Sequence, residues 1–151
     1  MSDVKITVNG IVHELSVEPR KVLADDEILT AVRFPVWGAG SGFAVEEVAR
    51  RHGDFALVGA VCGVQISGGV VSRSAVAMFG MGSAPLRATA AERGLLGADP
   101  ATVDAAALAA ASIVGLDPPT DIHANGEYRK AVGAHVIARV IARAIEEARG
   151  E

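Results

Sequence analysis

The chain has 151 residues, of which 50% are hydrophobic and only 4% aromatic, and its formal net charge is -4. This length is typical of one domain and suffices to bury a core without disulfides or metals. The acidic balance argues against a nucleic-acid partner, whose phosphates require clustered cations, and a single cysteine excludes a disulfide or four-cysteine cluster within the chain.

The first predicted elements are two paired strands. Residues 4–8 and 12–17 alternate apolar and polar side chains on either side of Asn9-Gly10, and both turn residues tolerate a positive φ. A hairpin of two strands is only marginally stable in water. We therefore expect it to extend a sheet, to cover an apolar surface or to pair with a second copy of the chain.

The next segments predict a short strand over residues 27–35, ended by Pro35, and a flexible connector, "WGAGSG". The following "FAVEEVARRHG" predicts a helix that ends at Gly53. Its apolar side would carry Phe43, Val45, Val48 and Ala49, and its polar side Glu46, Glu47, Arg50 and Arg51.

The rest of the chain predicts a hairpin and then helices. Two β-rich runs between residues 56 and 82 meet at Gly68-Gly69. A short helix is expected after Ser83 and Pro85, and a second one from the N-cap Asp99 to Gly115. A last helix presents Val132, Val136, Val140 and Ala144 at four-residue spacing. Strands followed by helices predict an α+β domain, with an antiparallel sheet covered by helices on one face.

Four stretches carry a family resemblance: "DEILTAVRFP", "EVARRHGDFALVGA", "AVAMFGMGSAPLRATAAE" and "LDPPTDIHANGEYRKAV". In this order they resemble the C-terminal domain of the flavoprotein (medium) subunit of molybdenum hydroxylases, the carbon monoxide and xanthine dehydrogenase group. We expect this domain to span residues 26–151. The preceding "VKITVNGIVHELSVEPRKVLAD" resembles the start of the iron–sulfur small subunit of the same complexes, so residues 1–25 would form a separate hairpin and linker, joined as in a gene fusion.

The resemblance implies that both cofactor sites are missing. In the family, FAD is held mainly by a region that precedes this domain, and the cluster cysteines of the small subunit follow its first hairpin. "GAGSG" could hold phosphate, but it lacks the Gly-Lys-Ser/Thr of a P-loop and the Rossmann spacing, so a plain loop is the alternative. We expect no cofactor and no metal, with FAD as the alternative.

The same resemblance predicts a bare ligand-binding surface. The family domain supplies one wall against the flavin ring, which here corresponds to Leu29 and to residues around Glu46 and Arg50. An apolar wall left uncovered favours association, so we expect a homodimer that binds a small molecule.

Two polar motifs are candidates for chemistry. "RRHGDF" places Arg50, Arg51 and Asp54 beside a histidine, as an anion and acid–base site or as a helix cap with an ion pair. In "DIHANGEYR", Asp121 and His123 could orient each other with Tyr128 as proton donor, or the motif could simply cap a helix and pair with Arg129.

Two further residues have similar alternatives. Glu47 would act as a general base in a closed apolar pocket or remain a solvated carboxylate. Cys62 lies in an apolar run and is expected to be a buried small hydrophobe.

Three functions remain open. The first is a repurposed, cofactor-free domain that binds a small molecule and catalyses addition, elimination, cyclisation or hydrolysis. The second is a redox accessory subunit that docks with a molybdenum hydroxylase and contributes to FAD binding. The third is a non-catalytic assembly module. The sequence has no apolar segment of membrane-spanning length and no signal-peptide pattern, so we expect a cytoplasmic protein without membrane contact.

Overall fold

The computed structural model describes residues 2–8, 11–17, 28, 30, 31, 35–51 and 53–150. The chain divides into two compact units, Met1–Val36 and Trp37–Glu151. The boundary expected between residues 25 and 26 stays a prediction.

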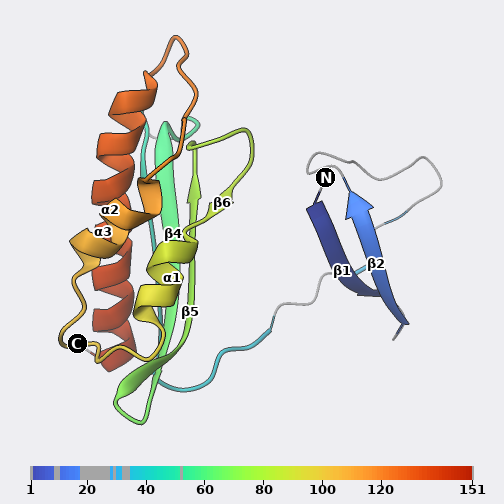
Figure 1. Cartoon of the computed structure of the whole chain (residues 1–151), viewed down its shortest axis with the longest axis vertical. Helices are drawn as coiled ribbons and strands as arrows, with labels where there is room; N and C mark the ends of the chain where they lie inside the picture. Colours follow the sequence, from blue (N-terminus) through green and yellow to red (C-terminus); the bar gives the residue numbers. More distant parts are fainter. Residues whose placement is uncertain are drawn as a thin grey trace. The chain divides into compact units, whose positions relative to one another are not determined.

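The first unit contains the predicted hairpin. Strand β1 (Ser2–Val8) pairs antiparallel with β2 (Ile11–Val17), so that Val8 lies opposite Ile11 (Figure 1). The Asn9-Gly10 turn lies outside the described residues. The sequence predicts a strand over residues 27–35. None of the four residues described there belongs to a strand: Ile28, Thr30, Ala31 and Pro35.

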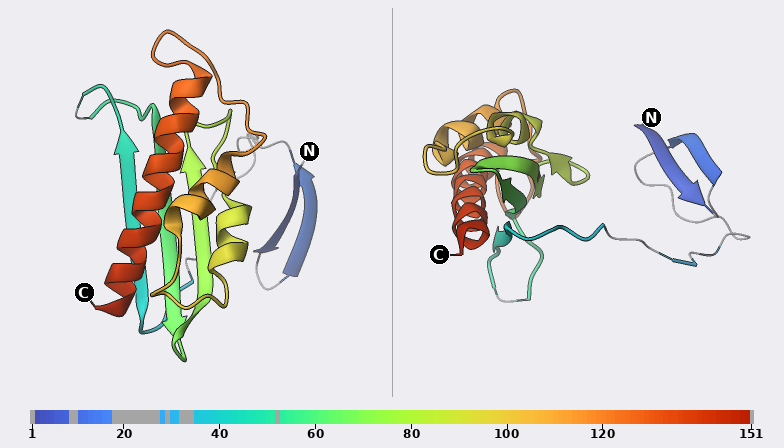
Figure 2. Two further views of the ribbon diagram at one scale, coloured as in Figure 1. Left: turned by 60° about the vertical axis from the view of Figure 1, so that its left-hand side comes forward. Right: turned by 90° about the horizontal axis from the view of Figure 1, so that it is seen from below.

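The second unit is built on a four-stranded antiparallel sheet in the order β3-β4-β5-β6 (Figures 1 and 2). Its strands are β3 (Ser41–Val48), β4 (Val58–Ser67), β5 (Val70–Phe79) and the short β6 (Leu86–Arg87). Strands β4 and β5 turn at Gly68 and Gly69, whose φ angles are 61° and 81°. The predicted second hairpin is therefore confirmed.

The helix predicted over residues 43–53 is wrong, because residues 41–48 form β3. Along this strand the even-numbered residues from Gly42 to Val48 are buried or half-buried, whereas Phe43, Val45 and Glu47 are exposed. A period of two is that of a half-buried strand, and pairing with β4 satisfies the backbone of β3. Four apolar and four charged residues in this segment also fit a helical pattern, which is why periodicity alone failed.

Three helices lie on one face of the sheet, as predicted: α1 (Thr89–Leu95), α2 (Ala105–Ile113) and α3 (Gly126–Arg149) (Figure 2). Helix α3 runs along β3 and β4, and α2 packs against α3 and α1. The predicted apolar side of α3 is buried, including Val136, Val140 and Ala144. None of the helices in the described part of the chain has the length and hydrophobicity needed to cross a membrane.

Two helix starts differ from the predicted ones. Helix α1 begins after β6 and not at Ser83 and Pro85. Helix α2 is capped by Asp104, whose carboxylate accepts a 2.9 Å hydrogen bond from the N–H of Ala107. Asp99 instead holds a turn by accepting from the N–H of Ala101. Both aspartates lie before the same alanine-rich run, so the sequence did not distinguish the cap from the turn. Helix α2 ends at Ile113, two residues before the predicted Gly115, which has a φ of 76°.

Candidate functional site

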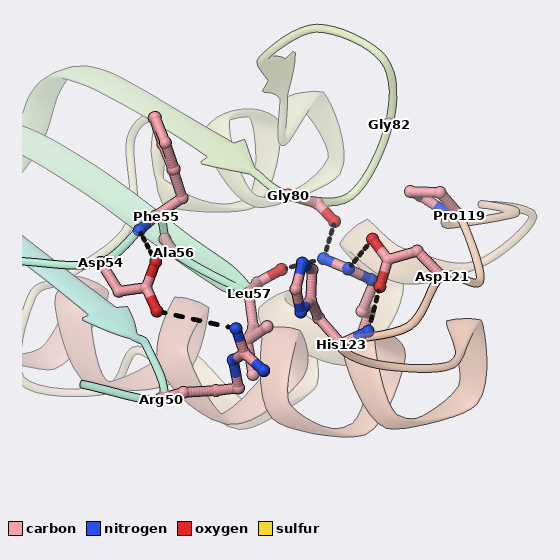
Figure 3. A pocket seen from close by; sticks show the side chains of 11 residues that line it. Arg50, Asp54, Phe55, Ala56, Leu57, Gly80, Gly82, Pro119, Asp121 and His123 are labelled. Carbon is pink, nitrogen blue, oxygen red and sulfur yellow. Dashed lines mark hydrogen bonds and ion pairs between the residues drawn. The ribbon is translucent and has the colours of Figure 1, made fainter.

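A polar pocket of about 360 Å³ lies where the loops after β3, after β5 and before α3 meet. Figure 3 shows that it brings together residues of two motifs far apart in the sequence, Arg50 and Asp54 from one and Asp121 and His123 from the other. Phe55, from the loop after β3, also lines the pocket and is 95% exposed. The fold therefore makes one site from two candidate sites.

Arg129 forms the floor of this polar pocket. Only 5% of its side chain is exposed, and its guanidinium donates to the backbone carbonyls of Leu57 and Gly80 and to the carboxylate of Asp121, at 2.7 Å for the last. Its Nε is buried and has no hydrogen-bond partner in the described structure. Arg129 thus joins three segments of backbone, a structural role that uses most of its donors.

Asp121 is held by the backbone of its own loop. One carboxylate oxygen accepts hydrogen bonds from the N–H groups of His123 and Ala124, at 2.8 and 3.0 Å. The bonds from Ala124 and His123, followed by the Arg129 charge, lower the pKa of the Asp121 carboxyl below its ordinary value. The interaction between Asp121 and His123 runs through the backbone N–H and not through the imidazole, which is exposed.

The Arg50 motif lies in a loop and not at the end of a helix. Asp54 makes two ion pairs, at 3.8 Å with Arg50 and 3.5 Å with Arg51, and accepts from the N–H of Phe55. The ion pair expected if this motif has only a structural role is therefore present. Because no helix ends here, a helix dipole cannot stabilise the charges of Arg50 and Arg51. His52 lies outside the described residues.

The other sequence candidates lie away from the polar pocket. Glu46 faces α3 and pairs with Arg139 and Arg143, at 3.1 and 3.6 Å, while Glu47 is exposed on the opposite side of β3. Tyr128 is 43% exposed in the first turn of α3 and does not line the pocket. Leu29 lies outside the described residues, and catalytic roles for Glu47, Asp121, His123 and Tyr128 stay predictions.

A second candidate surface is the sheet face that the helices leave uncovered. The sequence predicts a bare apolar surface but assigns it to Leu29, Glu46 and Arg50, none of which is among the residues of this face. We call it the open face, and it consists of the odd-numbered residues of three strands: Ser41, Phe43, Val45, Glu47, Gly59, Val61, Gly63, Gln65, Arg73, Ala75, Ala77 and Phe79. Phe43, Val45 and Val61 are 51%, 62% and 42% exposed. The sequence signal for this face is the alternation of side chains between the two faces of β3. The helix predicted over the same residues concealed it.

Aromatic residues rest on the small residues of the open face. The Trp37 and Phe43 rings meet edge to face with centroids 5.1 Å apart, and both lie over Gly63, where a Cβ would meet them at 3.0 to 3.3 Å. The guanidinium of Arg73 stacks 4.0 Å from the centroid of the Trp37 ring. The centre of the open face is thus apolar and carries aromatic side chains.

The chemistry of the open face can be compared with the parts of a flavin. Its exposed apolar and aromatic side chains are of the kind that lines sites for ring systems. The glycines of "GAGSG" are used by the fold: the Gly40 carbonyl accepts from the N–H of Ile66, and the position of a Cβ on Gly42 is occupied by the α3 backbone at Ala144. This loop is therefore held against β4 and α3 and is not a free connector.

Cysteine and metal chemistry find little support in the described residues. Cys62 is fully buried, as predicted, and burial raises the pKa of its thiol to about 12, which disfavours the reactive thiolate. Among the residues that the structure describes, no three His, Cys, Asp or Glu side chains are grouped so as to hold a metal ion.

Known proteins resemble this chain in sequence. It is 36% identical over 124 residues to the 6-hydroxypseudooxynicotine dehydrogenase complex subunit alpha of Paenarthrobacter nicotinovorans, covering 82% of this chain and 42% of the relative. The chain thus spans about two fifths of the length of that relative.

Two solved structures share the fold. Carbon monoxide dehydrogenase from Hydrogenophaga pseudoflava, lacking the Mo-pyranopterin moiety, matches with a TM-score of 0.67 and 32% identity, over 73% of this chain and 38% of the other. Quinoline 2-oxidoreductase from Pseudomonas putida 86 matches with a TM-score of 0.65 and 31% identity, over 72% and 38%.

A family model confirms the expected relationship. The CO dehydrogenase flavoprotein C-terminal domain matches residues 43–144, which include β3 and most of α3. The similarity of the first hairpin to an iron–sulfur subunit stays a prediction. The chain belongs to the CO dehydrogenase flavoprotein C-terminal domain family, whose relatives are subunits of molybdenum hydroxylases.

Proposed function

We propose that this chain is a flavin-facing domain of an FAD-dependent assembly of the molybdenum hydroxylase type, and that it acts through the open face. The domain supplies an apolar wall for the flavin ring, while another chain, or residues beyond those described, binds the phosphates. The observation that carries this proposal is the combination of an uncovered apolar sheet face with membership in a flavoprotein domain family.

The division between ring and phosphates has a measurable consequence. Riboflavin has the ring but no phosphate, whereas ADP has the phosphates but no flavin ring. If the chain contacts only the ring, riboflavin and FAD bind with the same Kd and ADP does not compete. Binding can be followed through Trp37, the single tryptophan, which lies on the open face.

A variant in the centre of the open face provides the specificity control. Val45→Asp would place an unpaired carboxylate against the ring and weaken riboflavin binding at least about tenfold, which corresponds to ~1.4 kcal/mol. Val114→Asp, on the exposed end of α2, should leave the affinity unchanged. Competition by ADP, or a much tighter Kd for FAD than for riboflavin, would contradict the proposal, as would no flavin binding at all.

The second candidate function is a cofactor-free small-molecule site in the polar pocket. The specific observation in its favour is that two separate polar motifs converge there, with the imidazole of His123 exposed beside Arg50. Such a site could bind a small polar molecule and transfer a proton through His123. A screen of small carboxylic acids, repeated with His123→Gln, tests it: hits must bind the wild type and weaken in the variant.

The cytoplasmic location, the lack of a nucleic-acid partner and the homodimer stay predictions. The dimer has a structural argument of its own, which follows.

A further inference from the structure

Within the second unit, the helices leave apolar side chains exposed at the centre of the open face. Val45 and Val61 lie opposite each other in register and are 62% and 42% exposed, and Phe43 next to them is 51% exposed. They form one contiguous group on a regular sheet, unlike isolated surface residues. Contiguous exposed apolar patches usually mark interaction sites.

Two opposite charges occupy opposite corners of this face. Glu47 lies at the far end of β3, and Arg73 lies on β5 in the row that contains Gln65 and Ser41, at the other end of the sheet. Within the described part of the chain, neither side chain forms an ion pair; Arg73 stacks on Trp37 instead. Each corner therefore carries a charge that a binding partner could match.

The arrangement is complementary to itself. Glu47 on β3 and Arg73 on β5 have one strand, β4, between them and are offset by six residues along the strand direction. Two strand spacings and six residues correspond to about 10 Å by about 20 Å. Consider two copies stacked with their open faces together. A twofold axis can lie midway between the two faces, perpendicular to the line that joins these corners. Rotation about this axis places each Glu47 over the Arg73 of the other copy. Both ion pairs then form at once around the apolar centre, as an isologous interface requires.

We infer that a second copy of this chain covers the open face, with Glu47 of each protomer paired with Arg73 of the other across a twofold axis. Stacked sheets lie about 10 Å apart, so side chains from the two faces interdigitate. The short side chains of Ala75 and Ala77 on β5, which are half-buried, offer the partner's apolar side chains a contact surface. The burial of these apolar side chains stabilises the dimer, and the ion pairs at the corners set its orientation.

A mixing experiment with two charge-reversal variants of the full chain tests this pairing. Glu47→Arg places two arginines against each other in its homodimer, and Arg73→Glu places two glutamates against each other. Each variant alone should dimerise at least about tenfold more weakly than wild type, because facing like charges repel. Mixed together, they restore both ion pairs, so a heterodimer with near wild-type affinity should form and be resolved by native mass spectrometry.

Two apolar variants serve as matched controls. Val45→Asp, in the centre of the open face, should abolish the dimer while circular dichroism shows a folded chain. Val114→Asp, on the helical side, is exposed to a similar degree and should leave the dimer intact. Sedimentation at rising protein concentration gives the dissociation constants.

Several results would overturn the inference. These are a wild type that stays monomeric at all concentrations, charge variants that dimerise as well as wild type, failure of the mixed variants to pair, or loss of the dimer in Val114→Asp. All measurements are made without flavin. The second copy and the flavin ring would occupy the same face and exclude each other, so the two proposals are tested on separate species. A wild type that stays monomeric but binds riboflavin would reject only the dimer. A monomeric Glu47→Arg or Arg73→Glu chain that binds no riboflavin would reject only the flavin wall.

Discussion

Arg129 holds together three loops at one end of the sheet. It is almost fully buried, and it satisfies two backbone carbonyls and one carboxylate from three different loops. Replacement with a side chain of similar length but no donors would leave the carbonyls of Leu57 and Gly80 without a partner, and buried unpaired groups are costly.

The variant Arg129→Met should therefore lower the free energy of unfolding by about 3 kcal/mol. Urea denaturation followed by circular dichroism measures this change. Lys130→Met is the matched control, since Lys130 is the next residue of α3 and its ion-pair partner Glu127 is 86% exposed; we expect a change within about 0.5 kcal/mol. Equal effects would show that Arg129 is not the structural centre of the pocket.

The carboxyl group of Asp121 makes the free energy of unfolding depend on pH in the acid range. Its pKa is lower in the folded protein because the carboxylate accepts backbone hydrogen bonds and faces Arg129. A lowered folded pKa adds stability above the unfolded value, near 3.9, and this contribution is lost as the pH falls through the folded pKa. Asp121→Asn should thus be less stable than wild type at neutral pH, and the difference should shrink as the pH falls below about 4. A difference that stays constant with pH would contradict this explanation.

Single residues were predicted best where their chemistry is local. The pairing of Arg129 with an acidic neighbour and the burial of Cys62 follow from short-range pattern and composition. The meeting of Arg50 with His123 could not be predicted, because it depends on how two loops from distant parts of the chain are brought together by the sheet.

At the scale of elements, β3 decides which surface the domain presents. As a helix, residues 43–53 would have placed Glu46 and Glu47 on one polar side; as a strand, they lie on opposite faces. Glu46 meets the arginines of α3, whereas Glu47 joins Phe43 and Val45 on the open face. Helix α3 was easier to predict because its apolar periodicity extends over 24 residues.

The close packing of β3 against α3 gives a direct test of this element. Gly42→Val would put side-chain atoms where the backbone of α3 at Ala144 and Ala148 lies, and overpacking of this kind costs about 1–3 kcal/mol. Ser41→Val, on the opposite face of the same strand, should change stability by less than about 1 kcal/mol, since the strand preference of valine offsets the lost hydroxyl. Thermal unfolding compares the two. Similar stabilities would mean that α3 does not lie against Gly42.

At the scale of the whole molecule, the second unit has one face closed by helices and one face left open. The α+β architecture and the family were predictable, because the strand and helix order and several long motifs survive in the sequence. The open face was not, since its exposure results from strands that alternate and from helices that all lie on the opposite side. This face, and not the polar pocket, is the centre of the proposed function.

The measurement that tests this claim most directly is a map of backbone amide chemical shifts in the full chain as riboflavin is added. If the open face contacts the flavin ring, the changes concentrate on β3, β4 and β5 around Val45 and Val61, together with the indole of Trp37. The loops that carry Arg50 and His123 should change little. Changes centred on those loops would contradict the flavin-wall proposal and place the functional site in the polar pocket.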